Sequence, residues 1–127
     1  MIMLNVLRLI LSVAAVCIAG LAAASMVGNP VRGQQIFNRC SGCHSVEGEN
    51  KSGPFLNGVV GREAATVAKY RYSPALSNSG LTWTEEALDE YLAGPTKAVR
   101  GTRMTISVSR EQDRADIIAY LKSLGSP

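Results

Sequence analysis

The sequence has 127 residues, which is enough for one domain, and it contains 13 Lys and Arg, 10 Asp and Glu and a single His. Its formal charge of +3 is too small for the strongly basic face expected of a nucleic-acid-binding protein. Aromatic residues make up only 6%, so a domain of this size has few large side chains to fill a core.

The first 24 residues differ in kind from the rest of the chain. A single cation, Arg8, precedes an apolar run over residues 9–24, which ends in the small residues Ala22, Ala23 and Ala24. This layout is typical of a secretory signal peptide cleaved after Ala24. An uncleaved membrane anchor is the alternative, although a spanning helix needs roughly 20 apolar residues. We expect a signal peptide over 1–24, a linker over 25–30 and one domain over 31–127.

The first helix of the domain is expected from about Val31 to Gly42, and it leads into Cys40-Ser41-Gly42-Cys43-His44. On one helical turn, two thiols three positions apart can form thioethers with the two vinyl groups of one porphyrin. The next residue then offers its imidazole to the iron. The motif therefore predicts one covalent haem c, attached through Cys40 and Cys43.

Other functions of a Cys pair have less support here. A disulfide, a redox dithiol and half of a zinc site are the alternatives. A zinc site needs a second ligand pair, but the one remaining cysteine, Cys17, lies in the apolar leader. A redox dithiol of the thioredoxin type needs a βαβ context, and no strand-like alternation flanks the motif.

Residues 47–61 are rich in Gly, Asn, Ser and Pro and are expected to form a loop. Within this loop, Pro54 keeps its carbonyl but has no N–H to donate. Its oxygen is one of several candidates to accept the Nδ1 proton of His44 and to fix the orientation of the ring.

Three further helices are expected. A short one begins at Pro74 and ends at residues 78–80. A capping box over residues 82–85 predicts a helix from Glu85 to Ala93, which Gly94 and Pro95 end. A second capping box over residues 109–112 predicts a helix that ends at about Leu124.

Met104 lies in the segment over residues 96–108, which has no helical period. By default, a methionine in a loop is a surface or gap-filling residue. In a haem protein, however, a thioether can be the second axial ligand of the iron. The other methionines, Met1, Met3 and Met26, lie in or beside the leader, so Met104 is the only candidate.

These motifs, in this order, resemble those of class I cytochromes c, in particular the small mitochondrial and soluble bacterial type. The resemblance covers residues 33–124. It rests on Gly33 with Ile36-Phe37, Cys40-Ser41-Gly42-Cys43-His44, Gly53-Pro54-Phe55-Leu56 with Gly61-Arg62, Tyr72-Ser73-Pro74-Ala75-Leu76, Gly80-Leu81-Thr82-Trp83, Glu90-Tyr91-Leu92, Gly101-Thr102-Arg103-Met104 and Asp116-Ile117-Ile118-Ala119-Tyr120-Leu121-Lys122. It implies an all-α fold, a single cytochrome c domain whose helices wrap around one covalently attached haem.

The same resemblance implies a role for each site residue. His44 and Met104 would be the axial ligands, and Pro54 would orient His44. Three residues would hold the haem propionates, namely Arg62, Tyr72 and Trp83. Tyr91 would lie near the Met104 side of the haem, and Thr102 would steady the ligand loop. Gly33 and Phe37 would let the first helix cross the last one closely.

The sequence departs from the family pattern in two places. Arg100 stands where the family usually has Pro, which predicts a less rigid ligand loop. The lysines that ring the haem edge of mitochondrial members are replaced by a thinner patch in which arginine predominates, formed by Arg39, Lys51, Lys97, Arg100 and Arg103. An acidic face of a redox partner is expected to dock there.

The function implied by the resemblance is that of a monomeric periplasmic electron carrier, which is not an enzyme. Its partners would be redox proteins such as membrane oxidases, dehydrogenases or a cytochrome bc-type complex, and not nucleic acid. A haem enzyme or gas sensor, such as a weak peroxidase with a labile Met104, is the alternative. Retention of the leader would make the protein a carrier anchored in the inner membrane.

Overall fold

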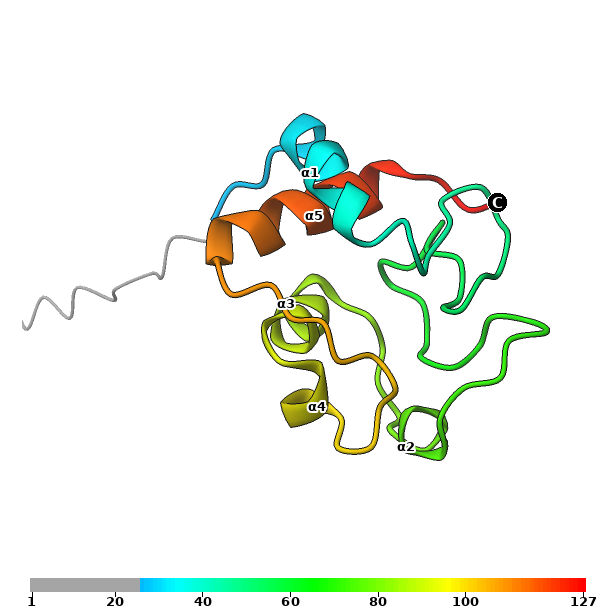
Figure 1. Ribbon diagram of the computed structural model, residues 1–127. Helices are drawn as coiled ribbons and strands as arrows, with labels where there is room; N and C mark the ends of the chain where they lie inside the picture. The colour runs from blue at the N-terminus through cyan, green and yellow to red at the C-terminus, as the bar shows by residue number, and fades with distance from the viewer. Residues whose placement is uncertain (1–25) are drawn as a thin grey trace, which may run out of the picture.

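The computed structural model describes residues 26–127, and the signal peptide expected over 1–24 lies outside these residues. The described part is helical, with one isolated bridge between Glu63 and Thr82 and no strand. Its elements are α1 (Pro30–Ile36), the 3-10 helix η1 (Phe37–Arg39), α2 (Pro74–Ser77), α3 (Glu85–Ala93), α4 (Pro95–Ala98) and α5 (Glu111–Ser123) (Figure 1). The all-α prediction is confirmed.

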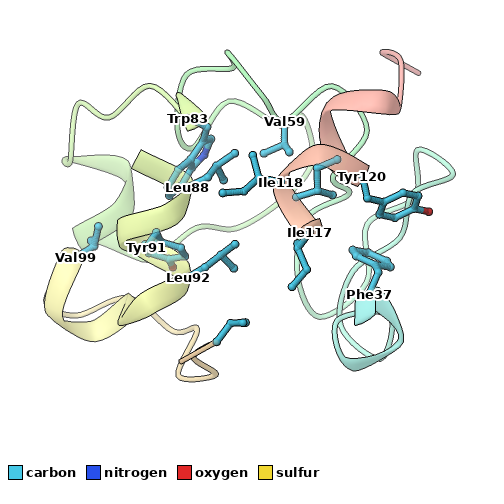
Figure 2. Packing of buried hydrophobic residues seen from close by; sticks show 12 residues of the cluster. Phe37, Val59, Trp83, Leu88, Tyr91, Leu92, Val99, Ile117, Ile118 and Tyr120 are labelled. Atoms are coloured by element: carbon cyan, nitrogen blue, oxygen red, sulfur yellow. The ribbon is translucent and has the colours of Figure 1, made fainter. Parts of the chain in front are cut away.

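The main helix contact joins the two ends of the domain, where α1 lies across α5 (Figure 1). Gly33 makes the crossing possible, because a Cβ at this position would overlap the backbone carbonyl oxygen of Asp116. Beyond it, the rings of Phe37 and Tyr120 pack with their centroids 5.5 Å apart (Figure 2). The close crossing implied by the family resemblance is therefore confirmed.

An ion cluster with two buried carboxylates and a partly exposed arginine fixes the start of α1 on α5. Arg32 donates to Asp113 at 2.6 Å and also pairs with Asp116, whose side chain is only 1% exposed. Asp116 accepts two further hydrogen bonds, from the backbone N–H of Asn29 at 2.7 Å and from Gln112 at 2.8 Å. Burial alone would raise the pKa of Asp116, but its hydrogen bonds outweigh burial and hold the pKa below the ordinary value.

The first helix begins one residue earlier than expected and is shorter. Gly28 packs on α5 and Pro30 already belongs to α1, although both were expected in a linker. At the other end, α1 stops at Ile36 instead of Gly42. The chain tightens there because the N–H of Cys40 donates to Phe37, three residues back, at 2.7 Å.

Two helices have different N-caps from those predicted. α3 begins at Glu85 as expected, but the hydroxyl of Thr84, not of Thr82, accepts the capping hydrogen bond from Ala87 at 3.1 Å. α5 begins at Glu111 with no side-chain cap, so the box predicted at Ser109 is wrong. Acidic residues in the first turn of α5 supply a favourable charge instead.

The short helices show both a success and a failure of prediction. α2 begins at Pro74, is capped by Ser73 and ends before Asn78, as expected. α4 was not predicted, because its single turn is too short to show a helical period. Across residues 26–127, no helix has the length and apolar character needed to span a membrane.

Replacing Gly33 with valine should destabilise the domain by about 3 kcal/mol or more, because the added side chain forces α1 away from α5. Chemical denaturation of the haem-loaded protein measures this change. Gly125→Ala is the matched control, since no atom lies within 4 Å of a Cβ at that position. Equal stability of the two variants would contradict the account of the crossing.

Replacing Asp116 with asparagine should lower stability at neutral pH, because the lowered pKa of Asp116 stabilises the fold above the unfolded value of about 3.9. This contribution is lost as the pH falls through the lower folded pKa, so the two proteins should converge in acid. Denaturation curves from pH 7 to about pH 3 test this. Glu90→Gln, which removes an exposed carboxylate, is the control and should leave the stability at neutral pH near the wild-type value.

Candidate haem-binding site

A cavity of about 400 Å³ lies among the helices and the long loops. Its wall is mainly apolar and includes side chains from both ends of the chain. The aliphatic part of the wall consists of Leu56, Val59, Leu76, Leu88, Leu92, Ile106, Ile117 and Leu121. Such an apolar wall with a few polar groups is typical of a binding site for a cofactor.

Every residue predicted to bind the cofactor lines this one cavity. These residues are Cys40, Cys43, His44, Pro54, Arg62, Tyr72, Trp83, Tyr91, Thr102 and Met104. They come from separate parts of the chain, which the fold brings together. Their individual roles toward a haem stay predictions.

The two cysteines lie on one hydrogen-bonded turn, as the spacing predicts. The N–H groups of Cys43 and His44 both donate to the carbonyl of Cys40, at 3.1 and 3.0 Å. Both thiols are free, Cys40 being half-buried and Cys43 exposed. Burial raises the pKa of Cys40. Within residues 26–127, no group of three or more His, Cys, Asp or Glu side chains is placed to hold a metal, so a zinc site has no further ligands there.

His44 is held in one orientation and one tautomer. Its Nδ1 lies 2.7 Å from the carbonyl oxygen of Pro54, which can only accept, so the proton is on Nδ1. Burial lowers the pKa of His44, and the charge of Lys51 lowers it further, against the effect of the Pro54 hydrogen bond. The imidazole is therefore neutral near pH 7, and Nε2 keeps a lone pair for a metal ion.

Gly53 is required next to this ring. A Cβ at position 53 would overlap the imidazole of His44, so only glycine lets the backbone approach so closely. Sequence reasoning placed Gly53 in a loop motif without this function. The only signal was a glycine before the proline that orients the histidine.

A cation stands at the cavity without a carboxylate partner. Arg62 is half-buried and donates to the carbonyls of Asn57 at 3.0 Å and Phe55 at 3.1 Å. None of the ion pairs among residues 26–127 includes it. Burial lowers the pKa of Arg62, yet an arginine stays charged at neutral pH. A positive charge in this position fits an anionic group such as a haem propionate.

Aromatic side chains form a further part of the wall. Trp83 is 7% exposed and packs edge-on against Tyr91, with ring centroids 4.9 Å apart. The hydroxyl oxygen of Tyr72 accepts a hydrogen bond from the N–H of Val67 at 3.2 Å. Burial raises the pKa values of Tyr72 and Tyr91, so both phenols keep their protons near neutral pH.

Met104 is half-buried and lies in a segment that other elements hold at its start. The hydroxyl groups of Tyr91 and Thr102 lie 2.5 Å apart and share a hydrogen bond. Arg103 donates to the carbonyl of Arg71 at 2.9 Å, which ties this segment to the loop before α2. Met104 itself packs against the buried core cluster.

Sequence reasoning missed Asn50, which joins two loops beside the cavity. Its Oδ1 accepts from the N–H of Phe55 at 3.2 Å, and its Nδ2 donates to the carbonyl of Ala68 at 3.0 Å. In the same region the hydroxyl of Tyr70 donates to the carbonyl of Ser52 at 2.7 Å. An asparagine in a loop rich in Gly and Asn carries no signal that would separate this bridge from an ordinary turn.

The chemistry of the cavity fits a covalently attached haem. Two free thiols and a neutral imidazole lie on one hydrogen-bonded turn at its wall. A thioether and an unpaired guanidinium line the same space, and most of the remaining wall is apolar. This donor set matches the ligands and the low-polarity shell that haem sites require.

Comparison with known proteins gives the same result. The cytochrome c family model matches residues 30–125. The chain is 46% identical over 103 residues to a cytochrome c2 from Rhodomicrobium vannielii, covering 79% of this chain and 82% of that protein. It is 44% identical over 103 residues to the cytochrome c-type cyt cy of Rhodobacter capsulatus, covering 80% of this chain and 52% of that protein.

Solved structures agree with the sequence comparisons. Cytochrome cH from Methylobacterium extorquens superposes with a TM-score of 0.73 at 43% identity, covering 76% of this chain and 99% of that chain. Ferricytochrome c2 from Rhodopseudomonas palustris gives a TM-score of 0.71 at 38% identity, covering 76% and 98%. The chain therefore belongs to the class I cytochromes c, which are electron carriers with one covalently attached haem c.

Proposed function

We propose that this protein is a periplasmic electron carrier in which His44 and Met104 are the two axial ligands of the haem iron. The observation that carries the proposal is the cavity, because it has both side chains and both cysteines in its wall. When bound there, the haem supplies one-electron chemistry between ferric and ferrous iron. Two protein ligands leave no coordination position for a substrate, so we propose no enzymatic activity.

The protein side of this function is to hold the ligands and to exclude water. Pro54 fixes the His44 ring so that Nε2 is available to the iron. The apolar wall keeps the cofactor in a medium of low polarity, and a Met/His ligand pair raises the reduction potential. Arg62 balances the charge of the propionates, and Tyr72 and Trp83 are their further partners.

A thin basic patch supports docking of an acidic partner. Arg39 and Arg103 line the cavity, and Lys51, Lys97 and Arg100 are exposed. A patch of one sign steers a partner of opposite charge and orients the encounter. We propose that the protein acts as a monomer, with redox partners such as membrane oxidases, dehydrogenases or a cytochrome bc-type complex.

Export to the periplasm is supported by the leader over residues 1–24, with its apolar run and the small residues Ala22 and Ala24. Cleavage after Ala24 would release the carrier. Retention of the leader would tether it to the inner membrane. The relatives named cytochrome c2 come from bacteria, which is consistent with an exported carrier.

Met104→Leu tests the ligand pair directly. The ferric wild-type protein should show the long-wavelength iron–sulfur absorption band, and its ferrous form should bind carbon monoxide poorly. The variant should lose the band and bind carbon monoxide readily, because the thioether is removed. Its reduction potential should also be lower, because Met/His ligation raises the potential. Met26→Leu should behave as wild type. Absence of the band from the wild type would favour a haem enzyme or gas sensor, such as a weak peroxidase.

The leader is tested by sequencing the N-terminus of the mature protein from fractionated cells. Cleavage predicts Ser25 as the first residue and recovery of the protein in the soluble periplasmic fraction. Replacing both Ala22 and Ala24 with leucine should block the peptidase and move the protein to the membrane fraction. A wild-type protein that begins at Met1 and stays with the membrane would identify the anchored form.

A further inference from the structure

We propose that Arg114, on α5, is a positioning residue for Met104. It anchors the end of the ligand-bearing segment to α5 and α3, so that the thioether stays on the iron. The inference rests on the proposed His44 and Met104 ligation. It concerns a part of the chain that no sequence motif marked, ten residues beyond the ligand.

Residues 104–107 depend on their flanks for position. Among residues 26–127, no backbone or side-chain hydrogen bond involves any of these four residues. Thr105 and Ile106 line the cofactor cavity, and Ser107 is exposed. A segment without hydrogen bonds of its own stays in place only where its two ends are fixed.

The start of the segment is fixed by contacts already described, at Thr102 and Arg103. Arg100 precedes them, so the backbone there lacks the restriction that a pyrrolidine ring would give. The position of Met104 therefore depends more on the other end of the segment, at Val108.

Val108 is the fixed point at that far end. It is only 5% exposed, and its N–H donates to the carbonyl of Leu92 on α3 at 2.7 Å. Its carbonyl accepts from Nη1 of Arg114 at 3.1 Å. The same nitrogen donates to the carbonyl of Ser109 at 2.9 Å. Both backbone groups of Val108 are thus occupied, one by α3 and one by α5.

Asp89 holds the guanidinium in the position that makes these bonds. Its carboxylate accepts from Nε of Arg114 at 2.7 Å and from Nη2 at 3.4 Å. The Arg114 side chain is 11% exposed, so water competes weakly for its donors. The planar fork reaches a carboxylate on α3 and two carbonyls of the loop at once. The single ammonium of a lysine could not match this geometry.

The hydrogen bonds from Arg114 to the two carbonyls favour the closed site, in which Met104 is bound to the iron. In the open site, Met104 is displaced. An added ligand that binds only the open iron has an apparent affinity proportional to the open fraction. Loss of the Arg114 bonds frees Val108 and Ser109 and raises that fraction. Binding of such a ligand should therefore become tighter.

The experiment titrates the ferric haem-loaded protein with imidazole and follows the iron–sulfur band. Arg114→Met, which keeps the side-chain length but removes every donor, should lower the apparent Kd for imidazole about tenfold or more. Arg114→Lys should have an apparent Kd for imidazole between those of Arg114→Met and the wild type, because lysine lacks the planar guanidinium. An unchanged Kd in Arg114→Met would overturn the inference.

Two controls separate positioning from general loss of stability. Arg32→Met breaks the ion pairs with Asp113 and Asp116, which do not involve Val108. This variant should lower stability without changing the Kd for imidazole. A similar tightening in Arg32→Met would overturn the inference. Arg110→Met, an exposed cation without a side-chain cap bond, should change neither quantity.

The remaining outcomes are also decisive. A wild-type protein without the iron–sulfur band would refute the proposed ligation itself. If the wild type shows the band and the Arg114 variants have the wild-type Kd, the proposed ligation stands and only the role of Arg114 is refuted. If both Arg114 variants fail to fold, Asp89→Asn still tests the inference, since it loosens the guanidinium and should tighten imidazole binding severalfold. Unchanged binding in that variant would overturn it.

Discussion

The crossing of α1 and α5 at Gly33 is the contact on which the rest of the structure depends. It joins segments from opposite ends of the domain, so it closes one large loop that contains every other element. The turn with Cys40 and His44 follows α1 after the short helix η1, and α5 supplies Ile117 to the cavity wall. A change in the distance between these helices would therefore alter the spacing between the attachment point and the opposing wall.

The short helices α2 and α4, of four residues each, are far below the length at which a helix is stable alone. Their order must come from packing against the rest of the domain, and α2 supplies Leu76 to the cavity wall. The fold and the cofactor site are in this sense one structure. Trp83 and Tyr91 belong to the buried core (Figure 2), and both also line the cavity that would hold the haem.

Sequence reasoning predicted α2, α3 and α5, and it singled out ten residues that all line the cavity. The hydrophobic period and the Gly and Pro residues that end helices are local signals, and the attachment motif indicates the cofactor. It failed for features that depend on backbone direction or on contacts between distant parts of the chain. The choice of Thr84 over Thr82 as a cap depends on backbone direction, and Asp116 and Arg114 appear in the sequence as ordinary charges on a helix. Their partners lie many residues away, so only the fold reveals that they are buried.

The hydrogen bonds of Asn50 do not depend on a group that titrates near neutral pH. A side-chain amide neither gains nor loses a proton between pH 5 and 8, whereas a histidine in the same bridge would change its charge in that range. The two loops that Asn50 joins are therefore held by hydrogen bonds that do not change between pH 5 and 8. The only imidazole of the chain is already held by Pro54. These two hydrogen bonds therefore persist when the surrounding medium becomes more acidic within that range.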